Sequence, residues 1–557
     1  MAKHMVNLDA LIRREDFEAA APDVLTQPSG LMANLGVAEL GPDSFMYNVL
    51  RKPDFQRETA NWTPDKVAAL VRSFLEGDLI PAIILWRSPK SGNIFTIDGA
   101  HRLSALIAWV HDDYGDKHRS LRFFDGVIPS EQLKAAEATR KLIQESVGSF
   151  NELKLALQNA DTTPKERLRL ARNLSAFALQ LQWVNGEAEK AESSFFRINQ
   201  QATPIDPTEL DMIKARRKPN ALAARAFIRA GTGHKYWSSF DDSVQLEIES
   251  HAKDVYDLIF RPTLDLSIRS TDLPVAGQGY SADSLKMVFE LVNFVNKLRP
   301  EMWRSEASTR KRAIPSQGAI TALADDPDGV ATIEFMRATK KAAMKIAGNS
   351  PASLGLHPAV YFYSATGRFQ PAAFLAAVAF TQELVERRSL NKYTALRCPF
   401  EEFLVNYKHF LNQIVQAYGS LQRSVPAILE MYRILLDSLA DGLPEEAIVR
   451  RMQKNSNPRL PVKMITDEDR KHGRNFSSET KNAIVLKATL ESSSRCNICG
   501  ARLHLRAMTI DHKIRKEDGG TGDPGNGHMT HPYCNSGYKE SGHISQSSAN
   551  TPNVENA

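Results

Sequence analysis

The chain has few cysteines, no long apolar run and little net charge. Four cysteines in 557 residues do not make a disulfide framework, which argues against a small disulfide-stapled fold. The longest apolar run, PAAFLAAVAF at 371–380, is about half the length that a bilayer requires, so no membrane insertion is predicted. The N-terminal MAKHMVNLDALIRRED lacks an apolar core followed by a small-residue cleavage site, which predicts a cytoplasmic protein.

The net charge of +5 is unevenly distributed. Residues 447–520 hold 16 Lys or Arg against 8 Asp or Glu, a local surplus of +8. Such a surplus suits a polyanion such as DNA or RNA, and a solvated linker is the alternative reading. The length exceeds what one hydrophobic core supports, so two to four domains are expected, and no fixed-period repeat is seen.

Secondary-structure patterns predict a multidomain α+β protein. The stretch TPDKVAALVRSFLEGDLIP predicts a helix that is capped by Thr63, starts at Pro64 and stops at Gly77. PAIILW and NIFTIDG read as strands, and AHRLSALIAWVHD reads as a helix. Residues 128–190 are predicted to be helical and charged, and three- and four-residue apolar spacing marks core helices such as 400–421 and 425–442.

The predicted domains follow from these shifts in pattern. They are an N-terminal extension (1–44), an α/β domain with a helical insertion (45–206), an α-helical domain (207–453), a linker (454–484), a cysteine-rich module (485–541) and a disordered tail (542–557).

The cysteine-rich module carries a candidate metal site. Cys496-x2-Cys499 and His531-x2-Cys534 each bring two ligands within reach of one ion, and together they make a Cys3His set for a structural Zn²⁺. The fourth cysteine, Cys398, is expected to be a buried small hydrophobe. His504 and His528 are expected to be surface or strand residues rather than ligands.

Between the two ligand pairs lie features that a purely structural zinc module does not need. They are the strand AMTIDHKI with Asp511-His512, the Gly519-Gly520 turn, Asn526, and CNSGYKES, which starts a short helix with Asn535 and Lys539. This order resembles the HNH (His-Me finger) nuclease family, whose ββα module runs C-x2-C, D-H, G-G, N and C-x2-C-N-x2-K. Here His531 stands in place of the first cysteine of the second pair.

The resemblance implies DNA hydrolysis, and the chemistry of the residues agrees with it. His512 is the candidate general base, and Asp511 and Asn535 are the candidate ligands of a catalytic Mg²⁺ or Mn²⁺. Asn526 is expected to orient His512 through a hydrogen bond. Lys513, Arg515 and Lys539 are candidate contacts to the DNA phosphates.

A second resemblance covers the N-terminal part of the chain. The stretch 53–109 and the segment SSFFRINQQATPIDPTEL resemble ParB/sulfiredoxin-like domains of the GmrSD type. The resemblance implies a nucleotide- or phosphate-binding site at the matching residues, which are Gln56, Arg57, Asp98, Gly99, His101, Arg102, Arg197 and Asn199. Ala100 replaces the glutamine of the family's D-G-Q-x-R pattern, so NTP is a candidate ligand but its hydrolysis is in question. A structural ion pair between Asp98 and Arg102 is the alternative.

A ParB-like domain joined to an HNH nuclease resembles bacterial anti-phage effectors, such as GmrSD-type restriction enzymes, the Ssp-type nickase and the nuclease subunit of Zorya systems. The leading hypothesis is therefore a metal-dependent DNA endonuclease or nickase that acts on invading phage DNA, with further defence subunits or a homodimer as candidate partners. The alternatives are an NTPase-gated, modification-dependent restriction nuclease and a nucleic-acid-binding regulator with an inactive HNH module.

Overall fold

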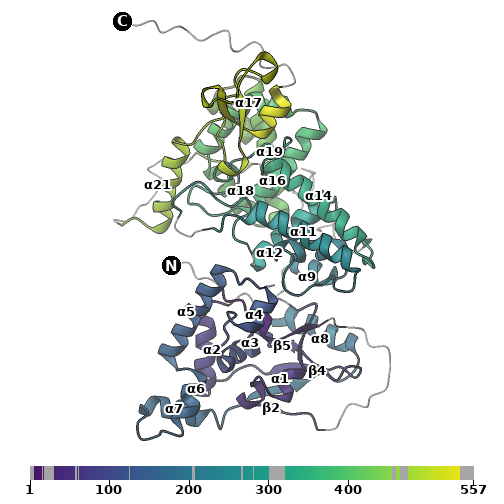
Figure 1. Ribbon diagram of the computed structural model, residues 1–557, viewed down its shortest axis with the longest axis vertical. Coiled ribbons are helices and arrows are strands. Elements are labelled where there is room, and N and C mark those ends of the chain that lie inside the picture. The colour runs from purple at the N-terminus through teal and green to yellow at the C-terminus, as the bar shows by residue number, and fades with distance from the viewer. Residues whose placement is uncertain are drawn as a thin grey trace. The chain divides into compact units, whose positions relative to one another are not determined.

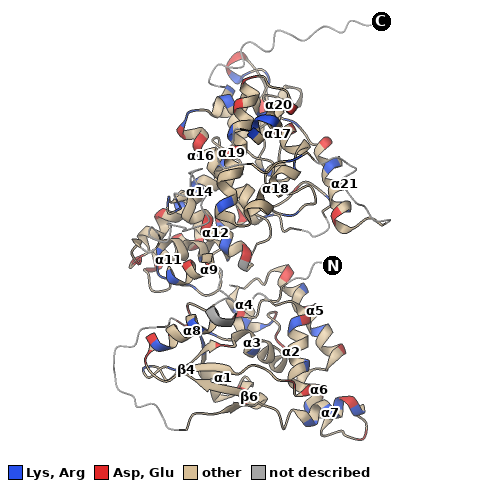
Figure 2. Cartoon of the chain, turned by 180° about the vertical axis from the view of Figure 1, so that it is seen from behind, with Lys and Arg blue, Asp and Glu red and all other residues tan. Residues whose placement is uncertain are grey.

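The computed structural model describes residues 5–15, 17, 30–56, 59, 62–124, 126–202, 207–264, 268–279, 281–299, 320, 322–454, 460–464 and 475–539. The chain divides into two compact units, which are described separately. Unit 1 comprises Met1–Leu222, Gly231–Phe240 and Ser281–Lys286, and unit 2 comprises the remainder. Figure 2 shows that Lys and Arg are interspersed with Asp and Glu over the helices of each unit.

Unit 1 is an α/β unit built on a six-stranded mixed sheet of order β1-β3-β5-β4-β6-β2. Most neighbouring strands are parallel, whereas β4 with β5 and β2 with β6 are antiparallel. The strands are β1 (Arg14–Glu15), β2 (Asn34–Leu35), β3 (Leu50–Pro53), β4 (Ile83–Arg87), β5 (Ile94–Asp98) and β6 (Leu179–Trp183). The helices are α1 (Phe45–Val49), α2 (Pro64–Glu76), α3 (Ala100–His111), α4 (His118–Phe123), α5 (Ser130–Ser146), α6 (Phe150–Ala156), α7 (Lys165–Asn173), α8 (Ala188–Ala202) and α9 (Pro207–Lys214).

Both faces of this sheet are buried, each against its own apolar core. Alternate residues of a strand point to opposite faces, so one strand contributes to both cores. Ile83 and Leu85 of β4 join a large apolar core that also contains side chains of α2, α3 and α5. Trp86 of the same strand faces the other way and joins a smaller core with Phe95 and with Phe195 of α8. Helices therefore cover the sheet on both sides (Figure 1).

The described residues of the predicted extension 1–44 are part of this unit rather than outside it. They contribute β1 and β2 to the sheet, and Leu8, Leu11 and Ile12 are at most 2% exposed in the core. The helical prediction for 128–190 also needs correction, because Leu179–Trp183 forms β6. Leu179 and Leu181 are buried while the glutamines between them are exposed, so the two-residue alternation of LQLQW was the available signal.

Unit 2 is predominantly helical and includes the cysteine-rich module. Its helices are α11 (Asp242–Phe260), α14 (Val330–Ile346), α15 (Pro358–Tyr361), α16 (Pro371–Glu386), α17 (Leu390–Asn406), α18 (His409–Tyr418), α19 (Leu421–Ala440), α20 (Glu445–Lys454) and α21 (Ser478–Glu491), and the boundary between the units falls within α10 (Pro219–Ile228) and α12 (Ala282–Val295). The apolar run at 371–380 lies in α16, which is buried along most of its length in the bundle. Among the described residues, no helix combines the length and apolar character needed to cross a membrane.

Two predicted boundaries differ in unit 2. The helix expected over 400–421 is interrupted at Tyr407-Lys408, where α17 ends and α18 begins. The predicted linker 454–484 contains the start of α21, because the Ser477 side chain accepts a hydrogen bond from the Thr480 amide and caps the helix. Most of the rest of this linker and the predicted tail at 542–557 lie outside the described residues.

Candidate nuclease and metal centre

The cysteine-rich module is a two-stranded antiparallel hairpin with a cluster of three cysteines and one histidine that could bind a metal ion. The strand β7 (Thr509–His512) pairs with β8 (Gly527–Thr530), and a short π-helical turn, Cys534–Tyr538, follows. Figure 1 shows the module, in yellow, beside α17.

The four candidate zinc ligands converge, as their spacing predicts. The ligand atoms of Cys496, Cys499, His531 and Cys534 all lie within 4.8 Å of one another. The Nε2 of His531 is 3.0 Å from the carbonyl oxygen of Arg502, so the ring can donate there and direct Nδ1 toward the three sulfurs. Burial lowers the pKa of His531, which favours the neutral imidazole that binds metals.

The donor set fits a structural Zn²⁺. Three soft sulfurs and one imidazole complete a tetrahedral shell without a position for water. Hydrogen bonds from Cys499 and Cys534 lower the pKa of Cys496, so one thiol of the cluster loses its proton readily. A closed shell stabilises the module and supplies no position for substrate.

Polar contacts fix the module to the helical bundle of unit 2. The guanidinium of Arg502 donates to both carboxylate oxygens of Glu402 on α17, each at 3.0 Å, and Arg495 donates to Glu402 Oε1 at 2.7 Å. The hydroxyl of Tyr533 donates to Asn391 Oδ1 at 2.9 Å. The module is therefore an integral part of unit 2.

Cys398 and His504 also lie at this contact. Cys398 is only partly buried and lies close to Gly500 of the module rather than in an apolar core. His504, expected at the surface or in a strand, is 2% exposed, and its Nε2 lies 3.6 Å from Asp272. Neither residue therefore has the surroundings that were predicted for it.

The candidate catalytic residues lie at the end of β7. Asp511 is 6% exposed, whereas His512 is partly exposed, and among the described residues its ring makes no hydrogen bond. Neighbouring residues of a strand point to opposite faces, so the imidazole of His512 is separated from the contacts of Asp511. Asn535 follows the last zinc ligand and is partly exposed.

All acceptor positions of the Asp511 carboxylate are used. Oδ1 accepts from the His512 amide at 2.8 Å and from Lys539 Nζ at 3.0 Å, and Oδ2 accepts from Lys539 Nζ at 2.7 Å and lies 3.1 Å from His528 Nε2. Burial raises the pKa of Asp511, but the hydrogen bonds with Lys539 and His528 outweigh it, and the net pKa is lowered. A carboxylate has about four lone-pair sites, so a metal ion must displace a donor to bind here.

His528 is the residue of this group whose role sequence analysis missed. It lies on β8 directly opposite Asp511 in the strand register. Its strand position was expected, but its contact with Asp511 was not. The signal that was available is the hairpin itself, because residues on facing strands meet in register once the turn is located.

Asn526 holds the loop between the strands. Its Oδ1 accepts from the Ile514 amide at 2.8 Å, and its Nδ2 donates to the carbonyls of Ile514 and Thr521 at 3.2 and 2.8 Å. All of these bonds are to loop backbone, so Asn526 does not make the predicted hydrogen bond to His512. Gly520 is required in the same loop, because a Cβ there would lie 1.9 Å from the Ile514 carbonyl oxygen.

The three candidate phosphate-binding residues of the module differ in how free their side chains are to reach DNA. Arg515 is exposed on the loop, and Lys513 is exposed but donates to the Gly525 carbonyl at 2.8 Å. Lys539, in contrast, is 16% exposed and bound to Asp511.

The second candidate site lies where β5 meets α3 in unit 1. Gly99 has a φ of +94°, and a Cβ there would lie 2.5 Å from Ile83, so the turn requires glycine. The Arg102 guanidinium donates to Asp98 Oδ2 at 2.6 Å and to the Ala82 carbonyl at 3.3 Å. This is the geometry that the structural ion-pair alternative requires.

The remaining predicted residues of this site do not form one visible cluster. The His101 ring stacks on Trp62 with 5.7 Å between centroids. Gln56 is buried, and Arg197 is exposed on α8. Arg57 and the side chain of Asn199 lie outside the described residues.

Comparison with known proteins finds two family models. The model of the GmrSD restriction endonuclease N-terminal domain matches residues 43–216, and the HNH endonuclease model matches residues 496–541. No curated protein and no solved structure matches the chain. The two matched segments are the ones that hold the β5–α3 turn and the β7–β8 hairpin.

Proposed function

We propose that this chain, a DNA endonuclease that joins a GmrSD-type N-terminal domain to an HNH domain, nicks invading phage DNA in a metal-dependent reaction. The observation that carries this function is the end of β7, where a buried, charged Asp511 adjoins an accessible His512. Asn535 lies next to the zinc ligand Cys534 and is the second candidate oxygen ligand. The zinc cluster and the Asn526 bonds hold this hairpin in place.

His512 acts as the general base in this proposal. A neutral imidazole accepts the proton of the attacking water, and the freedom of the ring leaves it able to do so. Bound by Asp511 and Asn535, Mg²⁺ or Mn²⁺ would stabilise the charge on the phosphate and the leaving oxygen. Exposed Arg515 would contact a neighbouring phosphate.

Lys539 controls access to Asp511. Because its ammonium occupies both carboxylate oxygens, Lys539 has to release Asp511 before a metal ion can bind there. A DNA phosphate near the site offers Lys539 an alternative anionic partner. We expect DNA binding and metal binding to favour each other for this reason.

The N-terminal domain regulates the nuclease in this proposal. It contains no cysteine and no cluster of metal-ligating side chains among its described residues, so strand cleavage is assigned to the HNH domain alone. Its β5–α3 turn is the candidate sensor of DNA or nucleotide. One HNH centre cleaves one strand, so a monomer produces nicks and a homodimer produces double-strand breaks.

Incubation of supercoiled plasmid with Mg²⁺, with and without NTP, tests these assignments. The wild-type chain should yield nicked circles, and His512→Ala should yield none while binding DNA within a few-fold, because a general base acts mainly on the transition state. His251→Ala, which removes a partly exposed histidine of α11 in unit 2, is the matched control and should cleave normally.

The products separate the alternatives. Linear plasmid in place of nicked circles would indicate a dimer, and cleavage that requires NTP would support the nucleotide-gated nuclease. Undiminished nicking by His512→Ala would refute the assignment of the nuclease centre. Tight DNA binding without cleavage under every condition would favour the regulator with an inactive HNH module.

A further inference from the structure

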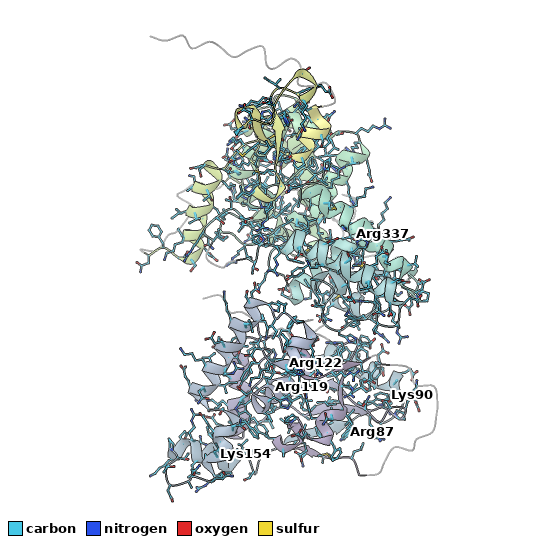
Figure 3. The ribbon with its side chains drawn as sticks, viewed as in Figure 1. Arg87, Lys90, Arg119, Arg122, Lys154 and Arg337 are labelled. Atoms are coloured by element: carbon cyan, nitrogen blue, oxygen red, sulfur yellow. The ribbon has the colours of Figure 1, made fainter. Side chains whose placement is uncertain are left out.

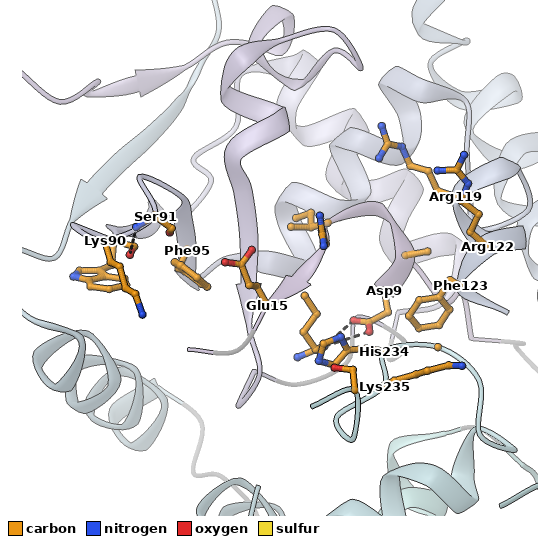
Figure 4. A pocket seen from close by; sticks show the side chains of 18 residues that line it. Asp9, Glu15, Lys90, Ser91, Phe95, Arg119, Arg122, Phe123, His234 and Lys235 are labelled. Carbon is orange, nitrogen blue, oxygen red and sulfur yellow. Dashed lines mark hydrogen bonds and ion pairs between the residues drawn. The ribbon is translucent and has the colours of Figure 1, made fainter. Parts of the chain in front are cut away.

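Unit 1 contains a cavity that neither candidate site uses. Its volume is about 1110 Å³, and its walls come from Asp9–Glu15, from the β4–β5 hairpin, from α4 and from the loop that holds His234 and Lys235 (Figure 4). None of the residues from Asp98 to Arg102 lines it. The walls of the cavity therefore do not include the β5–α3 turn.

The wall of this cavity is positively charged. Six of its residues are Lys or Arg and two are acidic, which gives a surplus of +4. The acidic groups are already paired within the fold: Asp9 binds Arg14 and Lys52 at 2.9 and 2.8 Å, and Glu15 binds Arg51 at 2.8 Å. The six basic residues are Arg13, Arg14, Lys90, Arg119, Arg122 and Lys235.

Three of these cations face the cavity without a neutralising neighbour. Arg13, Arg119 and Arg122 are exposed, and within the described part of the chain no carboxylate lies at ion-pair distance from any of them. Arg119 is held over the Tyr47 ring, 4.9 Å from its centroid, which fixes its position without cancelling its charge. Like charges gathered in a concave wall raise the local potential and attract an anion.

The charges lie at both ends of the cavity. Figure 4 shows Arg119 and Arg122 at one end and Lys90 with Ser91 at the other. A single phosphate would be held by one of these groups, whereas a chain of phosphates can reach both. This separation favours a polymer over an isolated anion.

Aromatic side chains form the apolar part of the wall. Trp86 and Phe95 are 1% and 3% exposed, so they support the wall from beneath, and the partly exposed Phe123 beside Arg122 is the ring that a base can reach. A cationic groove with an accessible aromatic ring is an arrangement that binds unpaired nucleotides, since a base can stack on the ring while the phosphates pair with the cations. A duplex is a convex rod with its bases covered, and it fits this concavity poorly.

We propose that this cavity binds a segment of single-stranded DNA, separately from the nuclease centre. Arg119 and Arg122 bind the phosphates at one end, and Lys90 binds them at the other. The site gives the N-terminal domain a means of engaging unpaired or extruded nucleotides of the target.

The test measures binding of a labelled 20-nucleotide strand, its duplex and the RNA strand of the same sequence by fluorescence anisotropy. The full chain with His512→Ala is used without Mg²⁺, so that nothing is cleaved. Adding R119E and R122E should weaken single-strand binding at least about ten-fold and reduce the magnitude of the salt slope by about 1.4, since each phosphate contact to a single strand contributes roughly 0.7. Duplex binding should change little.

The charge-matched control is K154E with K165E. Both lysines are exposed in unit 1, on α6 and α7, and Figure 3 shows Lys154 well away from Arg119 and Arg122. This control should retain single-strand affinity within about two-fold. Circular dichroism checks folding, and Arg119→Gln with Arg122→Gln replaces the charge reversal if that variant misfolds.

Three results would overturn the proposal: unchanged single-strand affinity in the arginine variants, an equal loss in the lysine control, or tighter binding of RNA than of DNA. Displacement of the strand by equimolar ATP would also overturn it, because the cavity would then be a nucleotide pocket. Plasmid cleavage by the wild type is scored separately. If the arginine variants lose single-strand binding but the wild type does not cleave plasmid, the single-strand site is supported and the nuclease function is rejected.

Discussion

The contact between Glu402 and Arg502 is one of the polar contacts that join the HNH module to the helical bundle. In Glu402→Ala, the Arg502 guanidinium loses two hydrogen bonds and its paired charge while its side chain is only 3% exposed. Removal of one partner from a fully buried ion pair costs about 3–5 kcal/mol, whereas an exposed pair contributes about 0–1 kcal/mol. Because the Glu402 side chain is 35% exposed, solvent screens the pair, and an intermediate cost of about 2 kcal/mol is expected.

Differential scanning calorimetry of the full chain measures this cost. For a large unit, 2 kcal/mol corresponds to a decrease of roughly 4 °C in the melting temperature of the transition that contains the module. Glu402→Gln keeps an acceptor oxygen and should fall between the wild type and Glu402→Ala. Glu446→Ala removes an exposed glutamate of α20 and should leave the transition within about 1 °C.

Identical melting of Glu402→Ala and Glu446→Ala would refute the reasoning. It would mean that the module is held by its other contacts, such as Tyr533 with Asn391, or that it moves independently. A decrease well above 8 °C would also contradict the magnitude, because it would require a pair as costly as a fully buried one.

Four further predictions concern other sites. Cys499→Ser should lose bound zinc, measured by elemental analysis, and unfold the module, since a closed site contributes directly to folding; a wild type without zinc would show that the ligand set is wrong. His504 and Arg506 hold the pKa of Asp272 at about 2, below its ordinary value of 3.8. The charged Asp272 carboxylate therefore contributes its full stabilisation above about pH 4, and this contribution is lost as the pH falls toward 2. Asp272→Asn should flatten the pH dependence of the unfolding free energy in that window, measured by urea unfolding. Lys539→Met should bind Mn²⁺ several-fold more tightly by electron paramagnetic resonance, and unchanged affinity would contradict its competition for Asp511. Arg102→Ala should lower the melting temperature, and Arg102→Lys should restore it if the pair with Asp98 is structural, whereas a phosphate-reading arginine would not be replaced by lysine.

Short sequence patterns were enough to predict the elements that depend only on neighbouring residues, such as helix ends and closely spaced ligand pairs. The α2 helix runs from Pro64 to Glu76 and ends at Gly77, as its first-turn proline and terminal glycine indicate. Within each candidate zinc-ligand pair, the two-residue spacing keeps the two ligands close together, and the pairing of β7 with β8 helps to bring the two pairs to one place. The order of residues from Asp511 to Lys539 was likewise sufficient to indicate a nuclease module.

Only the tertiary structure decided the contacts that join distant segments. The alternation in LQLQW is compatible with a strand, but the place of β6 in the sheet is set by its pairing with β4 on one side and β2 on the other. The partners of Asp511 depend on where the hairpin and the following turn bring His528 and Lys539. The basic cavity is assembled from four segments between residues 9 and 238, none of which is unusual in composition alone. Burial and long-range pairing select these arrangements, and neither can be read from the spacing of residues along one segment.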